Sequence, residues 1–206
     1  MGSRRKTGDD LRLPVISRRA LLGAGAAVVS GLSWPHSAAG DQHEADRPDL
    51  SPRGDADRRL SFAFRRNAYG FYRAAVGAQA GFPETSFHSL AIAIELSLKA
   101  YLLHRGISDD WNRSHIGHDL RLALACARRA GLRLVPDGLP DLASSLTPLY
   151  EHHAFGRSTT ATTVLLPLPQ ACETVLGLLH GVTVQIAEEI ALDEWAPRLR
   201  RENTHA

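Results

Sequence analysis

The sequence predicts an all-α protein, an up-and-down bundle of four main helices with one short helix and no credible sheet. Apolar residues recur at the i, i+3, i+4, i+7 spacing of a helix face in several long stretches. The clearest stretch runs from Phe87 without a proline or glycine until Gly106. With 44% hydrophobic residues, the chain can bury a core and is not expected to be disordered as a whole.

The same patterns place five helical segments along the chain. They are expected at residues 60–79, 87–106, 119–131, 139–150 and 169–190. The core face of the first is predicted to be Leu60, Phe64, Ala68, Phe71 and Ala75. That of the second is Leu90, Ala91, Ile94, Leu98, Tyr101 and Leu102. The core face of the last segment is predicted to be Ala171, Val175, Leu178, Leu179, Val182, Ile186 and Ile190. The length of this segment and its helical period favour a helix over a strand.

Local signals set the ends of the central helices. Gly106 and Gly131 suit the left-handed position that closes a helix. Asp119 is a good N-cap, because its carboxylate can accept free N–H groups of the following first turn. Residues 107–117 are expected to form a polar loop, so the helices on either side make an antiparallel αα-hairpin.

One charged pair lies within the long central stretch. Glu95 and Lys99 are four residues apart, in the order that favours an ion pair on a helix surface. Glu95 also lies beside Ala91 and Leu98, so partial burial with a partner is the alternative. The sequence favours the surface pair.

Two short strings in this region carry a family resemblance. They are IELSLKAYL at residues 94–102, followed by Gly106, and GHDL at residues 117–120. Together they resemble HEPN-domain proteins, which are small helical bundles of bacteria and archaea that are often dimeric. The resemblance spans about residues 60–189 and is sharp over the central hairpin. It implies a HEPN-like bundle and a homodimer.

The N-terminal region reads as an export signal. Arg18 and Arg19 precede a weakly apolar run rich in glycine and alanine, and small residues at 37–39 end it. These parts, in this order, resemble a twin-arginine signal peptide over residues 1–39, with cleavage near Ala39. Export to the periplasm or outside the cell is therefore expected, with contact to the membrane only in transit. A buried alanine-rich helix, or a misassigned start codon and a cytoplasmic protein, is the alternative.

Composition divides the rest of the chain. Residues 40–57 are rich in aspartate and proline and predict a disordered linker, residues 58–195 the bundle, and residues 196–206 a disordered tail. Six of the 24 Lys and Arg but only two of the 22 Asp and Glu lie in the first 39 residues, so the remainder carries a net charge of −2. On charge grounds the body is not a polyanion-binding protein, and no DNA-binding motif occurs.

Arginines nevertheless gather in the first helix. Arg65, Arg66 and Arg73 lie off its predicted core face. Such side chains can contact phosphate, but a solvated face is the commoner explanation.

The candidate site lies at the end of the hairpin. Many HEPN ribonucleases carry an arginine four to six residues before a histidine, and Arg113 and His118 match that spacing. There the histidine acts as base or acid on the 2′-OH or the leaving 5′-oxygen, and the arginine stabilises the phosphorane. In those enzymes the motif adjoins the last long helix, whereas here it precedes the helix that starts at Asp119. Arg113, His115, His118 and Asp119 are also predicted to bind an anion at that helix start.

Other chemistry has less support. Metal ligation by His104, His115, His118, His152 or His153 lacks any H-x3-H, HExxH or CxxC spacing, so no metal and no cofactor is expected. Cys126 and Cys172 can pair in an exported protein or remain small buried residues.

These observations lead to three functional hypotheses. The favoured one is a non-catalytic HEPN-like binding or regulatory module that self-associates and whose ligand is RNA, a nucleotide or another anion. The second is a metal-independent, toxin-type endoribonuclease using Arg113 and His118, so whether the chain is an enzyme stays open. The third is an exported, envelope-associated interaction protein.

Overall fold

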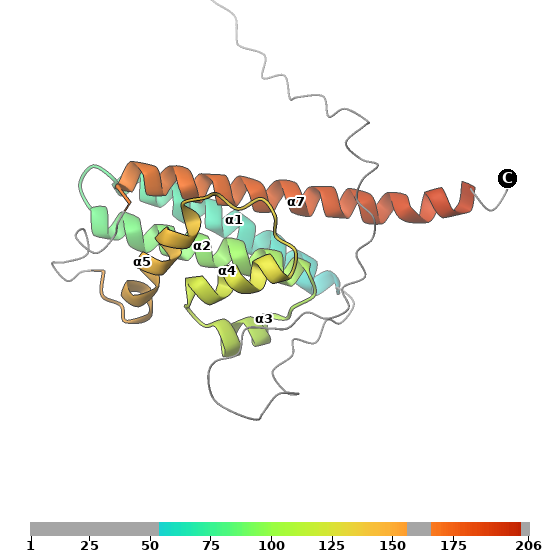
Figure 1. The fold of residues 1–206 in the computed structure, drawn as a ribbon, viewed down its shortest axis with the longest axis horizontal. Helices are drawn as coiled ribbons and strands as arrows, with labels where there is room; N and C mark the ends of the chain where they lie inside the picture. Colours follow the sequence, from blue (N-terminus) through green and yellow to red (C-terminus); the bar gives the residue numbers. More distant parts are fainter. Residues whose placement is uncertain (1–53, 156–165, 203–206) are drawn as a thin grey trace, which may run out of the picture. The chain divides into compact units, whose positions relative to one another are not determined.

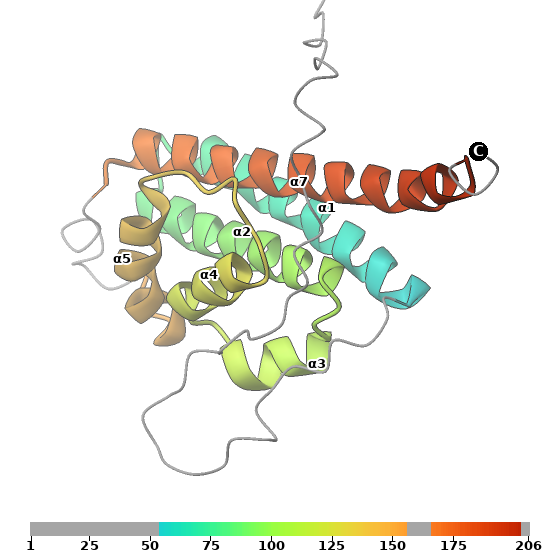
Figure 2. The ribbon, with the colours of Figure 1, turned by 45° about the vertical axis from the view of Figure 1, so that its right-hand side comes forward.

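The long helix α2 is the central element of the fold. In the computed structural model, which describes residues 54–155 and 166–202, α2 (Pro83–His104) contacts α1 (Asp55–Ala78), α4 (Leu120–Arg129), α5 (Leu139–Glu151) and α7 (Leu168–Glu202). Figures 1 and 2 show α1, α2 and α7 side by side, with the shorter α4 and α5 on the other side of α2. No strand occurs among the described residues, so the all-α bundle is confirmed.

The burial of α2 follows from its sequence. Of its 22 residues, 16 are buried, including the whole predicted face from Leu90 to Leu102. Serine and alanine at many other positions let neighbouring helices approach closely. The hydroxyls of Ser61 and Ser86 each donate to a backbone carbonyl across the α1–α2 pair, at 2.8 Å. A helix that is apolar on nearly all sides belongs in a core.

The predicted helix ends are confirmed at both glycines. Gly106 has φ 86° and Gly131 has φ 107°. After α2, the N–H of Ile107 donates to Leu102 O, and after α4 the N–H of Leu132 donates to Ala127 O. Both are Schellman closures. The carboxylate of Asp119 caps α4 by accepting from the N–H groups of residues 121 and 122, as predicted.

The segment expected as a polar loop is instead mostly helical. A single turn, α3 (Asp109–Trp111), continues into a π-helix at Asn112–Ile116. Ser108 caps this turn through its hydroxyl, which accepts from the N–H of Trp111. The segment folds back onto the bundle because Ile107 and Ile116 at its ends are buried. The polar composition predicted a loop. Instead, the two buried isoleucines hold the segment against the bundle, where it forms short helical turns.

The outer helices correct two further expectations. Phe71 is 37% exposed and Ile190 is 40% exposed, so neither belongs to the core face on which it was placed. Phe71 lies at the edge of the buried face of α1, which Ala68 and Ala75 define. Ile190 follows Ile186, the last buried residue in the part of α7 whose side chains are described. α7 continues to Glu202, past the boundary expected at residue 195, and α1 starts at Asp55, inside the expected linker.

Within the part of the chain that the structure describes, two helices are long and apolar enough to cross a membrane by length and composition alone, namely α2 and residues Leu168–Glu194 of α7. In α2, 83% of the apolar 18-residue stretch is buried inside the bundle, as expected of a core helix. The proposed leader, residues 1–39, lies outside the described residues, as does most of the proposed linker.

Candidate functional site

A pocket of about 340 Å³ lies where α1 and α2 meet the segment between α3 and α4. Leu96 and Phe64 form its apolar walls. Its polar lining consists of Glu95, Lys99, Asp109, Arg113, Gly117 and His118. The pocket thus brings together the two residues of the predicted catalytic pair, Arg113 and His118, with a pair of charges from α2.

The α2 charges are buried, which corrects the expectation of a surface pair. Glu95 is 7% exposed and Lys99 is 4% exposed. The Lys99 ammonium lies 2.6 Å from Glu95 Oε1 and donates a second hydrogen bond, 2.7 Å long, to Gly117 O. The sequence spacing placed the pair correctly, but the segment after α3 and the C-terminal end of α5 cover the face of α2 on which it lies.

Glu95 also fixes His118. Nδ1 of His118 lies 3.1 Å from Glu95 Oε2, and the Tyr150 hydroxyl donates to the same oxygen at 2.5 Å. Burial alone would raise the pKa of Glu95, but the hydrogen bonds from Lys99, Tyr150 and His118 outweigh it and hold that pKa below its usual value. An ionised carboxylate accepts only, so Nδ1 carries the proton. Nε2 of His118 is then an acceptor whenever the ring is neutral.

Tyr150 is the structural support of this arrangement. It is 7% exposed at the end of α5, and its ring packs edge-on against His118 with 5.0 Å between centroids. Burial, then the hydrogen bond to Glu95 and its charge, raise the pKa of the Tyr150 hydroxyl, which therefore stays a donor. The imidazole of His118, half exposed at 53% of its side chain, is held from two sides and open on the others.

Arg113 reaches the pocket from the π-helix. Its side chain is 68% exposed and pairs with Asp110 at 2.5 Å and with Asp109 at 3.5 Å. The hydrogen bond to Asp110, then the charges of both aspartates, raise its pKa. A guanidinium has five N–H donors, so these two contacts leave donors for a ligand. The π-helix ends at Gly117, whose φ of 55° and ψ of −120° turn the chain so that His118 faces the same pocket.

The other two predicted binding residues do not line the pocket. His115 stacks on Trp111, with 4.7 Å between ring centroids, and its Nδ1 lies 2.8 Å from the Ser114 hydroxyl. The Asp119 carboxylate occupies the N–H groups at the start of α4, the groups that were expected to bind an anion. Of the four predicted binding residues, Arg113 and His118 therefore line the pocket, and His115 and Asp119 do not.

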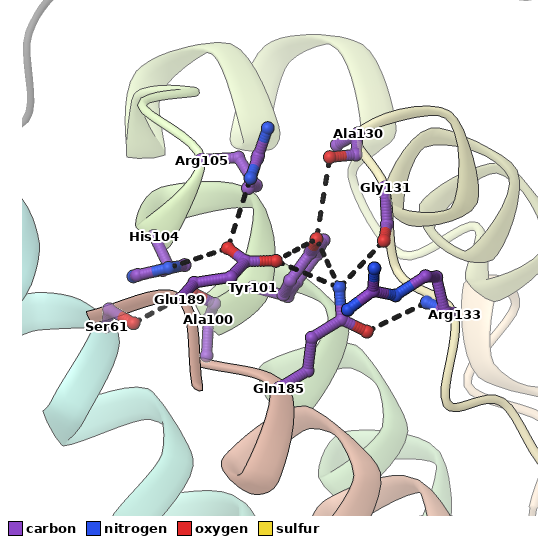
Figure 3. A network of polar contacts seen from close by, with 10 residues as sticks. All are labelled: Ser61, Ala100, Tyr101, His104, Arg105, Ala130, Gly131, Arg133, Gln185 and Glu189. Carbon is purple, nitrogen blue, oxygen red and sulfur yellow. Dashed lines mark hydrogen bonds and ion pairs between the residues drawn. The ribbon is translucent and has the colours of Figure 1, made fainter. Parts of the chain in front are cut away.

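A second polar network lies at the C-terminal end of α2, where it meets α7 (Figure 3). Glu189 of α7 accepts from Tyr101 at 3.1 Å, from His104 at 3.0 Å and from Arg105 at 3.1 Å, and Gln185 donates to it as well. Burial alone would raise the pKa of Glu189, but the hydrogen bonds from His104 and Gln185, with the charge of Arg105, lower it to about 2. The network fastens α7 to α2.

Sequence reasoning missed Glu95, Lys99 and Tyr150 as members of the site. The available signal was the isolation of Glu95 and Lys99 among apolar residues on every side of α2. No sequence signal linked Tyr150 to them, because it lies 55 residues after Glu95.

The other two candidate features, a metal site and a disulfide, do not form among the described residues. Among residues 54–155 and 166–202, no three His, Cys, Asp or Glu side chains are grouped so as to hold a metal ion. Cys126 and Cys172 are both buried free thiols, on α4 and α7. Burial raises the pKa of Cys126 to about 11.

No model of a known protein family matches this chain, and neither does any curated protein or any solved structure.

Proposed function

We propose that the chain is a HEPN-like helical module that binds a phosphate-containing ligand, a nucleotide or RNA, in the pocket between α2 and the π-helix. One observation carries the proposal: Arg113 and His118 line one pocket, and the buried Glu95 positions the histidine. The two strings behind the HEPN resemblance also meet there, since Glu95 and Lys99 of the first contact Gly117 and His118 of the second.

Net charge limits this pocket to modest anion binding. The Glu95–Lys99 pair is neutral as a whole, and Arg113 is outnumbered by its two aspartates, so the ligand would depend on the N–H donors that Arg113 has left and on His118. Protonation of His118 therefore makes the pocket more positive. The volume of about 340 Å³ lies at the lower end of the range for small-molecule sites and suits a single nucleotide.

The binding test is calorimetric titration of the full chain with AMP and with inorganic phosphate. Arg113→Gln and His118→Gln should each weaken AMP binding by about tenfold or more, because each removes a hydrogen bond to the phosphate, which His118 donates from Nε2 in its protonated form. Arg121→Gln, an arginine outside the pocket, is the matched control and should bind normally. Wild-type protein that binds neither probe, or an equally weakened affinity in all three variants, would contradict the proposal.

A metal-independent ribonuclease is the second candidate, and the Glu95–His118 contact favours it. With the proton on Nδ1, the neutral ring presents Nε2 as a base toward a 2′-OH, and Arg113 can stabilise the phosphorane. Mixed RNA is incubated with the full chain in chelator. Cleavage that disappears in both His118→Gln and Arg113→Gln, with circular dichroism unchanged, would establish the enzyme. If the RNA stays intact while the chain binds AMP, the result would support a binding module and contradict the ribonuclease.

We also propose that the chain is exported and self-associates. Arg18, Arg19 and the small residues at 37–39 support export, which also keeps an envelope-associated role open. Mass spectrometry of protein from a native-like host should show removal of the leader near Ala39. An intact cytoplasmic leader, unchanged by Arg18→Lys with Arg19→Lys, would contradict export.

Exposed apolar side chains on α7 support self-association. Ile190 is 40% exposed and Leu192 is 45% exposed. Sedimentation velocity should show a dimer that dissociates in Ile190→Lys with Leu192→Lys. A wild-type monomer at all concentrations would contradict this proposal.

A further inference from the structure

Arginine and aromatic side chains alternate along one outward face of α1. Arg58, Phe62, Arg65, Tyr69 and Arg73 follow one another at intervals of four, three, four and four residues. Residues three or four apart are neighbours on a helix surface, so these five side chains form one continuous arginine–aromatic stripe. From Arg58 to Arg73 the chain rises by 15 residues, so the stripe is about 22 Å long at 1.5 Å per residue.

Four of the five side chains of the stripe are exposed, and Arg65 at its centre is partly buried. Phe62 is 59% exposed and Tyr69 is 36% exposed, which is unusual for large aromatic rings on a helix whose other face is well packed. The guanidinium carbon of Arg65 lies 5.8 Å from the centre of the Phe62 ring, in cation–π geometry. Arg66 is exposed directly beside the stripe. The face of α1 that packs into the bundle holds Ala68 and Ala75, both fully buried.

Arginines outnumber acidic residues on α1. α1 contains five arginines and two aspartates. Within the described part of the chain, no carboxylate lies at ion-pair distance from Arg66 or Arg73. By contrast, Arg105, Arg113 and Arg121 each pair with a carboxylate. A local basic surface thus exists on a body whose net charge is negative.

We propose that the arginine–aromatic stripe of α1 is a docking surface for single-stranded nucleic acid. Exposed aromatic rings provide stacking platforms for unpaired bases, and arginines between them contact the phosphates; this combination is the general chemistry of single-strand binding. The stripe is independent of the pocket, to which α1 contributes only Phe64 from another side of the helix. The proposal therefore goes beyond the pocket function.

Three other occupants fit the stripe less well. A helix that lies in a membrane interface sinks its apolar face into the lipid, but the apolar face of α1 is already buried in the bundle. A second copy of the stripe would set arginine against arginine. A nucleic-acid duplex supplies phosphates but no unstacked bases for Phe62 and Tyr69.

The test measures fluorescence anisotropy of labelled 12-nucleotide single strands, in RNA and DNA versions of one sequence, with the full chain at several salt concentrations. Arg66→Gln with Arg73→Gln should lower affinity and reduce the slope of log K against log salt by about 0.7 for each phosphate that the variant no longer neutralises. Phe62→Ala with Tyr69→Ala should lower affinity by about tenfold or more and leave that slope unchanged.

Matched controls separate the stripe from general charge and aromaticity. Arg128→Gln with Arg129→Gln removes two exposed arginines of α4. Phe71→Ala removes a ring of α1 that is as exposed as Tyr69 but lies on another side. Both controls should bind like the wild type, and the RNA and DNA arms then show which sugar is preferred.

Several outcomes would overturn the proposal. One is the absence of binding to either strand by the wild-type chain. Another is an equal decrease in affinity in the stripe and control variants. A third is equal or tighter binding to a duplex or to anionic vesicles. A fourth is a wild-type dimer that Phe62→Ala with Tyr69→Ala dissociates, which would assign the stripe to a second copy.

Discussion

Glu95 links three parts of the chain through side chains of different chemistry. It accepts from Lys99 on its own helix, from His118 before α4 and from Tyr150 on α5, while Lys99 also bonds to the carbonyl of Gly117. A buried carboxylate is tolerated because each oxygen has at least one charged or polar partner. The same contacts that stabilise the carboxylate fix the proton on His118 Nδ1, so structural support and site geometry come from one residue.

Removing one partner of the buried pair should destabilise the fold strongly. Lys99→Met leaves Glu95 without its cation, and the free energy of unfolding should fall by about 3–5 kcal/mol. Glu95→Gln combined with Lys99→Met removes both charges and should recover part of that decrease. Urea denaturation followed by circular dichroism measures both, with the exposed Glu188→Gln as control. A change in Lys99→Met as small as that of the control would mean that the pair contributes little.

At the level of elements, the π-helix and the turn after it decide where the site residues point. π-helical turns are rare and often occur at functional sites. Here the π-helix at Asn112–Ile116 carries Arg113. Gly117, which follows the π-helix, has a positive φ that residues other than glycine rarely adopt. Gly117 O also receives the Lys99 ammonium, so this turn is fastened to α2.

Gly117→Ala should therefore destabilise the protein and weaken the pocket. A Cβ at this position meets nothing within 4 Å, so the cost is backbone strain alone, about 1–3 kcal/mol. The affinity for AMP should fall as well, because a change in the backbone at Gly117 moves the next residue, His118, which lines the pocket. Gly70→Ala is the matched control: its added Cβ also meets nothing within 4 Å, but it lies inside α1, where alanine should add up to about 1 kcal/mol of stability. Equal effects of the two substitutions would contradict this interpretation of Gly117.

At the scale of the whole molecule, two carboxylate networks, one around the buried Glu95 and one around the partly buried Glu189, fasten α2 to its neighbours at separate points. Glu95 lies in the middle of α2 and is bonded to α5 and to the segment before α4. Glu189 joins α7 to the C-terminal end of α2, where Gln185 also bonds to Tyr101 at 2.9 Å and to Gly131 O at 2.7 Å. Both carboxyl groups have lowered pKa values in the folded state.

This arrangement predicts acid sensitivity. A carboxyl group whose pKa is lower in the folded state binds fewer protons there than in the unfolded chain, so the free energy of unfolding decreases as the pH falls. For Glu189 the decrease should extend from an unfolded pKa of about 4.3 down to the folded value of about 2. Thermal unfolding between pH 6 and pH 2, in steps of about one unit, should show a weaker pH dependence in Glu189→Gln than in the wild type. A pH dependence in Glu189→Gln equal to that of Glu188→Gln would contradict the role of Glu189.

Local sequence specifies the helices and their ends. Helical period and end signals depend on neighbouring residues alone, so the α2 core face, the stops at Gly106 and Gly131 and the Asp119 cap could all be predicted from the sequence. The spacing of five residues between Arg113 and His118 also predicted that the two side chains lie together, and both line the same pocket.

Which polar residues are buried, and which of them meet, depends on the tertiary structure. Glu95 and Lys99 have the spacing of a surface pair, and nothing local shows that the π-helix and α5 cover them. Tyr150 meets Glu95, and Glu189 meets His104, across 55 and 85 residues of sequence. Burial depends on what packs against a face, and that is set by contacts between distant segments, which helical period alone does not specify.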